Sequence, residues 1–144
     1  MIYAVIDTNV FVSALLSRHP DSATVQVVNA LLKHGICPLY NQEIIVEYQD
    51  VLHRDKFRFP IEAIDYIINA VQDYGISAER VISSEIFPDP KDIVFYEVAL
   101  SKDDAYLVTG NIKHFPKTPI VVTPVEMLEI LKGQMRSLFP ERSN

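Results

Sequence analysis

The feature that most constrains the fold of this chain is its first seven residues, in which an apolar run ends on an acid. Ile2 to Ile6 are apolar and partly β-branched, a composition typical of a strand that is buried on both faces. Asp7 follows at once. In an open α/β sheet, ligands bind outside the carboxyl ends of the strands. The run therefore predicts a buried strand that presents Asp7 to such a crevice, as a candidate ligand for a metal or phosphate group.

The bulk properties of the chain indicate one globular domain. Its 144 residues suit a single domain, and an apolar content of 49% is enough for a sizeable core. No apolar run approaches the roughly 20 residues of a transmembrane helix, and the N-terminus lacks the features of a signal peptide. We therefore expect a soluble, cytoplasmic protein that does not associate with membranes. The single cysteine, Cys37, cannot form an internal disulfide, and we interpret it as a buried apolar side chain.

The net charge of −6 bears on the class of function. Proteins that only bind nucleic acid favour a basic surface, because they neutralise phosphates. An enzyme that gathers carboxylates around divalent cations instead carries an acidic site that the metal neutralises. The charge thus weakens the case for a simple binding module more than the case for a metal-dependent nuclease.

Strand and helix patterns alternate along the chain. Apolar runs between turn signals predict strands at residues 2–6, 36–39, 80–83, 105–109 and 119–123. Helical periodicity and capping residues predict helices at residues 10–16, 23–34, 42–54, 60–74, 91–101 and 124–132. This alternation predicts an α/β fold, a three-layer α/β/α sandwich with a central, mainly parallel sheet of four to five strands. We assign residues 1–133 to this domain and expect a flexible C-terminal tail at residues 134–144.

Acidic and amide side chains converge in this topology. Asp7 ends the first strand, Asn111 follows the fourth, Glu47 lies in the third helix, and Asp92 lies in the first turn of the fifth. Strand ends and helix starts share one edge of a parallel sheet. Oxygen ligands with few imidazoles favour Mg²⁺ or Mn²⁺ over zinc. Such a centre suits phosphodiester hydrolysis, because a metal ion activates water and stabilises the charge that develops on the phosphate.

Four motifs in this order resemble the PIN-domain ribonuclease family, close to the toxins of VapBC-like toxin–antitoxin systems. They are Ile6-Asp7-Thr8-Asn9-Val10, Glu47-Tyr48 with Val51-Leu52, Asp89-Pro90-Lys91-Asp92, and Tyr106 to Asn111 with His114-Phe115. Each motif alone is weak, whereas four at family-like spacing are specific. The resemblance covers roughly residues 1–132.

The resemblance implies a metal-dependent endoribonuclease that hydrolyses single-stranded RNA with one or two Mg²⁺ or Mn²⁺ ions. The residues it implies for catalysis are Asp7, Glu47, Asp92 and Asn111, of which the first three would bind metal. The residues it implies as supports for these ligands are Thr8, Asn9 and Thr109. Many family members have aspartate where this chain has Asn111, which brings no negative charge to a second metal site. The family also implies a homodimer and a cognate antitoxin protein.

Three further polar residues, Asp89, Glu97 and His114, rank below this set. Asp89 equally suits a turn with Pro90. Glu97 suits either the rim of the crevice or solvent, and His114 suits either a phosphate contact at the edge of the site or a structural role.

A basic and aromatic segment follows the helix that carries Glu47. Arg54, Lys56 and Arg58 alternate with Phe57 and Phe59, which suits phosphate contacts and base stacking along single-stranded RNA. The alternative is a helix end whose cations complement the helix dipole and whose phenylalanines are buried.

Other functions remain open at this point. A catalytically weakened PIN scaffold that binds RNA or a protein partner would explain Asn111, although three retained acids argue against it. A phosphatase of the haloacid-dehalogenase type would need a second aspartate at position 9, where this chain has Asn9. The purely structural alternatives are a helix cap for Asp7 and a solvated helix face for Glu47.

Overall fold

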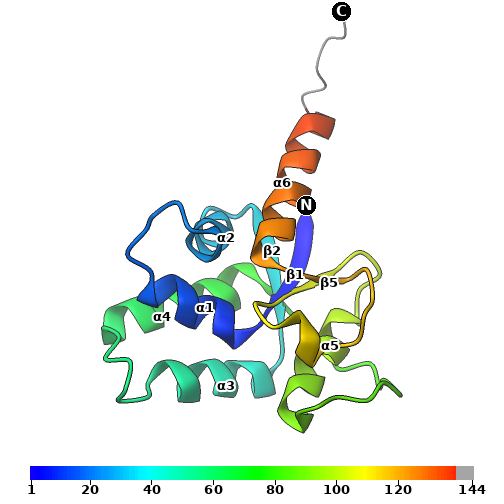
Figure 1. Ribbon diagram of the computed structural model, residues 1–144, viewed down its shortest axis with the longest axis horizontal. Helices are drawn as coiled ribbons and strands as arrows, with labels where there is room; N and C mark the ends of the chain where they lie inside the picture. Colours follow the sequence, from blue (N-terminus) through cyan, green and yellow to red (C-terminus); the bar gives the residue numbers. More distant parts are fainter. Residues whose placement is uncertain (139–144) are drawn as a thin grey trace, which may run out of the picture.

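The computed structural model describes the backbone of residues 1–138 and the side chains of residues 1–134 (Figure 1). Its strands are β1 (Ile2–Ile6), β2 (Ile36–Tyr40), β3 (Ile76–Ser77), β4 (Tyr106–Val108) and β5 (Val121–Val122). Its α-helices are α1 (Thr8–Leu16), α2 (Ala23–Leu32), α3 (Gln42–Leu52), α4 (Ile61–Tyr74), α5 (Ile93–Ala99) and α6 (Pro124–Leu138). Two 3-10 helices, η1 (Pro90–Asp92) and η2 (Ile112–His114), precede α5 and follow β4.

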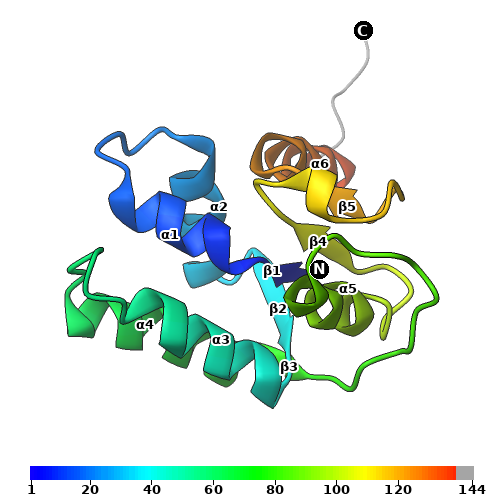
Figure 2. The ribbon, with the colours of Figure 1, turned by 60° about the horizontal axis from the view of Figure 1, so that its bottom comes forward.

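The five strands form one parallel sheet in the order β3-β2-β1-β4-β5. Figure 2 shows α5 on one side of this sheet and α1, α2 and α4 on the other, and α6 packs beside α2. The predicted α/β/α sandwich with a parallel sheet is thus confirmed. Within residues 1–138, no helix combines the length and the apolar character needed to cross a membrane.

Strand β1 lies at the centre of the sheet. Ala4, Val5 and Ile6 are at most 1% exposed, which agrees with burial on both faces. The strand pairs with β2 on one side and with β4 on the other, where Ile6 faces Val108 in register. From β1 the chain first builds the sheet on one side, through β2 and β3, and then crosses to the other side to form β4 and β5. The strand order therefore reverses between β1 and β4, and the carboxyl ends of these two strands mark the topological switch point of the sheet.

Helix α3 is fixed across the carboxyl end of the sheet. Asn41 caps it, because its side-chain oxygen accepts a hydrogen bond from the amide of Ile44 at 2.9 Å. One turn later, the fully buried Tyr48 donates its hydroxyl proton to the carbonyl oxygen of Ile6, at the end of β1. Since Glu47 precedes Tyr48, this bond sets where Glu47 stands relative to Asp7.

The predicted strand at residues 80–83 is wrong. The third strand is the shorter β3, and residues 80–83 form an irregular segment beside α5. The reason is that the amide groups of this segment bond to Glu97: the amide of Val81 donates to its carbonyl oxygen at 3.0 Å, and the amide of Ser83 to its carboxylate at 2.6 Å. The local β propensity of Val81 and Ile82 gives no hint of this acceptor.

Two smaller predictions also differ from the structure. Helix α6 does not end at Gly133 but continues to Leu138, so part of the expected tail at residues 134–144 is helical. Residues 139–144 lie outside the described residues, and the division at residue 133 stays a prediction. Cys37 is half-buried rather than buried, with its sulfur 3.6 Å from the carbonyl oxygen of Tyr74.

Two glycines offer a test of the packing. A Cβ at Gly75 would overlap the carbonyl oxygens of Val71 and Pro38, where α4 closes on β2, whereas a Cβ at Gly133 meets open space within α6. We predict that Gly75→Ala lowers the free energy of unfolding by about 3 kcal/mol, and that Gly133→Ala raises it by up to about 1 kcal/mol. Urea unfolding measures both. Equal effects of the two substitutions would contradict this packing.

Candidate functional site

The carboxylate of Asp7 lies at the switch point, where residues at the start of α1 and just after β4 form hydrogen bonds to it. Its oxygen Oδ2 accepts hydrogen bonds from the hydroxyl of Thr109 at 2.8 Å and from the side-chain amide of Asn9 at 3.1 Å. Asp7 stands at the N-cap position of α1 but makes no capping hydrogen bond with its side chain. The helix-cap interpretation of this residue is therefore wrong, because the carboxylate is directed at the end of β4.

The residues that support Asp7 also tie the loop after β4 into place. The hydroxyl oxygen of Thr109 accepts a hydrogen bond from the amide of Asn111 at 3.0 Å, and Oδ1 of Asn9 accepts one from the amide of Gly110 at 3.1 Å. Of the three predicted supports, Asn9 and Thr109 contact the carboxylate. The buried hydroxyl of Thr8 makes no hydrogen bond to any residue with a described side chain.

Asp92 approaches the same region from the opposite side of the sheet. It ends η1 and precedes α5, and its oxygen Oδ2 is buried without a hydrogen-bond partner among residues 1–134. Nδ1 of His114 lies 3.5 Å from that oxygen, a distance that suits an ion pair when the imidazole is protonated. His114 is 51% exposed at its side chain, so it stands at the rim of the site.

The charges of the three predicted acids influence one another. The pKa of Asp7 is raised to about 6, chiefly by burial and also by the charges of Asp92 and Glu47, while the hydrogen bond from Thr109 partly opposes this rise. Burial also raises the pKa of Asp92, with contributions from Asp89 and Glu47, and His114 opposes this rise. No lysine or arginine in the described part of the chain forms an ion pair with any of the three acids.

These acids fit a hard divalent cation by their chemistry, but they do not form a closed ligand set. Among residues 1–134, no group of three or more histidine, cysteine, aspartate or glutamate side chains is close enough together to hold one ion. The charges of Asp92 and Glu47 both contribute to the raised pKa of Asp7, and a divalent cation between these carboxylates would relieve that repulsion.

Asn111, Asp89 and Glu97 make no side-chain contact with Asp7, Glu47 or Asp92 among the hydrogen bonds and ion pairs of the described residues. The side chain of Asn111 is exposed where η2 begins, and it makes no capping hydrogen bond. Asp89 caps η1 by accepting a hydrogen bond from the amide of Lys91 at 2.9 Å, as expected of a turn residue. Glu97 lies neither at the crevice rim nor in solvent, because it is 4% exposed and paired with Arg80.

The sequence gives no indication of the role of Arg80. Its guanidinium group contacts Glu97 on α5 at 2.7 Å and Glu43 on α3 at 3.0 Å. It therefore joins α3, which carries Glu47, to α5, which follows Asp92. No local pattern could reveal this contact, because Arg80 and its two partners are 17 and 37 residues apart in the chain.

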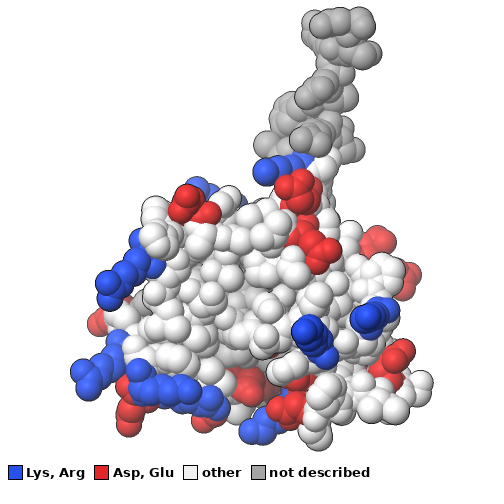
Figure 3. Space-filling model, viewed as in Figure 1, with Lys and Arg blue, Asp and Glu red and all other residues white. Residues whose placement is uncertain are grey.

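The basic segment lies at the far end of α3. Arg54, Lys56 and Arg58 are exposed, and Figure 3 shows basic side chains gathered over the turn between α3 and α4. The ring of Phe57 stacks on that of Phe59, with their centroids 5.0 Å apart, and the ammonium group of Lys56 lies 5.0 Å from the centroid of Phe57. Arg54 pairs with Asp50 at 3.6 Å, an exposed contact that a phosphate could replace, and the aromatic rings already have intramolecular partners.

Comparison with known proteins gives one family. A family model described as the PIN domain matches residues 3–113, a span that includes Asp7, Glu47, Asp92 and Asn111 and ends one residue before His114. PIN domains are generally nucleases, typically bind RNA and usually use divalent metal ions. Neither the curated proteins nor the solved structures provide a match to this chain.

The raised pKa of Asp7 leads to a stability prediction for the metal-free protein. Its pKa is about 6 in the folded protein against 3.8 for an exposed group, so the folded state holds this proton more tightly than the unfolded chain. The resulting stability is complete below the unfolded value and is lost as the pH rises through about 6. We predict that Asp7→Asn raises the free energy of unfolding by up to about 3 kcal/mol at pH 8, with no gain below pH 4.

Urea unfolding in EDTA at several pH values measures this difference. Asp65→Asn, an exposed position on α4, is the matched control and should have the same small effect at every pH. A pH-independent effect of Asp7→Asn would contradict the proposed burial of charge at the switch point.

Proposed function

The chain belongs to the PIN-domain family, and on this basis we propose that it is a metal-dependent endoribonuclease that hydrolyses phosphodiester bonds of single-stranded RNA. The observation that carries the proposal is the group of acids at the switch point, Asp7, Glu47 and Asp92, with no paired lysine or arginine among the described residues. A phosphodiester is itself anionic and would be repelled by these carboxylates alone. The arrangement therefore suits an anionic substrate only when a cation lies between the two.

We propose that Asp7, Glu47 and Asp92 hold Mg²⁺ or Mn²⁺, which when bound would polarise a phosphate oxygen and lower the pKa of a coordinated water. The remaining contributions come from the chain itself. Thr109 and Asn9 fix the orientation of the Asp7 carboxylate through their hydrogen bonds to Oδ2, and outer partners of this kind tune the affinity of a metal site. Glu47 and Asp92 approach from helix α3 and from the start of α5, so the sheet and two helices each contribute one acid.

We propose that one ion binds tightly. Asn111 follows β4, where a carboxylate would add charge for a second ion, and its amide supplies only a neutral oxygen. That oxygen can still ligate a metal or orient a water molecule. His114 stands at the rim beside Asp92, where a protonated imidazole would contact a phosphate of the substrate.

The proposal extends to substrate binding and biological role. Arg54, Lys56 and Arg58 are proposed to contact RNA phosphates. They are exposed, and they follow directly after the end of α3, the helix that carries Glu47. The motifs shared with VapBC-like toxins support a role as the toxin of a toxin–antitoxin pair. That role would bring a homodimer and a cognate antitoxin as partners.

A PIN scaffold that binds RNA without cutting it is the alternative function. Two observations favour it: the neutral Asn111, and the lack of a closed ligand set among residues 1–134. The retained and electrostatically coupled acids favour the enzyme, since a pure scaffold gains nothing from burying Asp7 as a carboxylate whose pKa is raised to about 6.

Cleavage of a labelled single-stranded RNA separates these functions. We predict metal-dependent cleavage with Mg²⁺ or Mn²⁺ that EDTA and Asp7→Asn both abolish. Thr109→Val, which removes one bond to Asp7, should slow cleavage by about 10- to 100-fold, and Asp65→Asn should leave the rate unchanged. Cleavage that survives EDTA or Asp7→Asn would refute the proposed centre, whereas RNA binding without cleavage would identify the scaffold.

A further inference from the structure

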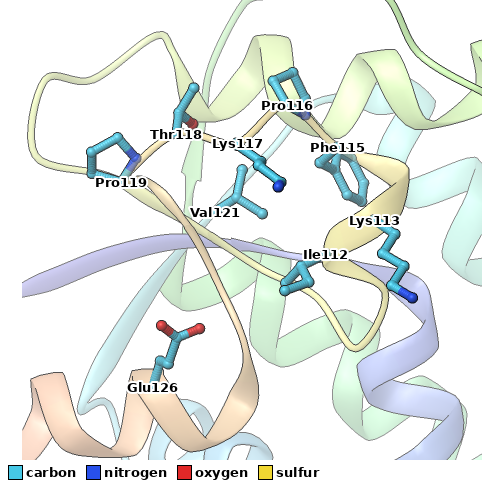
Figure 4. Close-up of a pocket in the computed structure, with 9 residues that line it drawn as sticks. All are labelled: Ile112, Lys113, Phe115, Pro116, Lys117, Thr118, Pro119, Val121 and Glu126. Atoms are coloured by element: carbon cyan, nitrogen blue, oxygen red, sulfur yellow. The ribbon is translucent and has the colours of Figure 1, made fainter.

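We infer that the cavity beside η2 is a subsite for one nucleotide of the RNA strand, an inference that rests on the proposed function. The cavity has a volume of about 760 Å³ and lies between η2, the loop that follows it, β5 and the first turn of α6 (Figure 4). This volume falls in the range of small-molecule sites. Its walls are mostly apolar and include Ile112, Phe115, Pro116 and Val121.

The cavity and the proposed metal centre lie on the same 3-10 turn, η2. This single turn comprises Ile112, Lys113 and His114: the first two line the cavity, and the third contacts Asp92 at 3.5 Å. Asn111, whose amide bonds to Thr109, precedes the same turn. Because η2 contributes to both places, we place the nucleotide next to the scissile phosphate in the cavity.

The charges of the cavity suit a phosphate rather than a cation. Lys113 and Lys117 line it, and neither forms an ion pair with any residue that the structure describes. Figure 4 shows the side chain of Lys117 between those of Phe115 and Val121, with Lys113 extending outward from η2. The one acidic lining residue is Glu126, whose carboxylate already accepts a hydrogen bond from the amide of Thr123 at 2.9 Å.

An apolar wall and two unpaired lysines together match the two parts of a nucleotide. A base presents apolar faces that pack on rings and aliphatic side chains, while the adjoining phosphates pair with the lysines. The wall of the cavity also carries the hydroxyl of Thr118, which is buried and has no hydrogen-bond partner within residues 1–134. A free nucleotide offers the same chemistry, but the η2 turn that the cavity shares with the His114–Asp92 contact favours a nucleotide within an RNA strand.

The test measures binding of a fluorescein-labelled single-stranded RNA decamer by anisotropy. All proteins carry Asp7→Asn and are assayed with Mg²⁺, so that the probe stays intact. Lys113→Ala with Lys117→Ala should weaken binding at least about five-fold and make the slope of log K against log salt less negative by about 1.4, since each single-strand phosphate contact contributes about 0.7. Ile112→Ala should weaken binding by about five-fold through lost base packing, with the slope unchanged.

The matched control is Lys33→Ala, another exposed lysine, which follows α2 and should change neither quantity. A double lysine variant that keeps the original affinity and salt slope overturns the subsite. Binding of 5′-AMP that depends on Lys117, with RNA binding unaffected, also overturns it and assigns the cavity to a free nucleotide. If only Arg54→Ala, Lys56→Ala and Arg58→Ala reduce RNA binding, the strand lies elsewhere and the subsite is refuted.

A parallel cleavage assay without the Asp7→Asn substitution separates this failure from that of the proposed function. Cleavage that needs Asp7 but not the cavity lysines refutes the subsite and leaves the nuclease intact. A chain that neither binds nor cleaves the RNA refutes both.

Discussion

The hydrogen bond from Thr109 to Asp7 is the contact on which the site depends. It joins the ends of β1 and β4, the two strands that flank the switch point, at 2.8 Å in a region where Thr109 is fully buried. A carboxylate in such a place is stable only with donors aimed at it. The bond therefore keeps the Asp7 carboxylate at the end of a buried strand, where a bound cation would relieve its repulsion from Asp92 and Glu47.

The two helices that carry or follow the other acids are held by polar side-chain contacts. Tyr48 anchors α3 to the end of β1, and the Arg80 guanidinium joins Glu43 on α3 to Glu97 on α5. Since Glu97 is almost fully buried, loss of Arg80 would leave an unpaired charge in the interior, which typically costs about 3–5 kcal/mol. These contacts make the spacing between Glu47 and Asp92 a property of the fold rather than of flexible loops.

The sequence is informative where function and periodicity coincide. The apolar run before Asp7 and the alternation of strands and helices predict a parallel α/β sandwich whose first strand is buried on both faces, and the structure agrees. The positions of Asn9 and Thr109 beside Asp7 follow from strand ends that share one edge. Local sequence patterns do not predict the structure of a segment whose hydrogen-bond partners are distant in the chain. The segment at residues 80–83 has strand propensity, yet its amides bond to Glu97. The same contact makes Arg80 structural, and no spacing in the chain indicates it.

The central claim is that Asp7, Glu47 and Asp92 together bind a divalent cation. Crystals grown with saturating Mn²⁺ test it directly, because anomalous diffraction locates manganese independently of any assumption about the ligands. We predict one anomalous peak within coordination distance of carboxylate oxygens from all three residues, with Glu47 moved toward the other two. A structure at saturating Mn²⁺ with no peak at these carboxylates would contradict the claim.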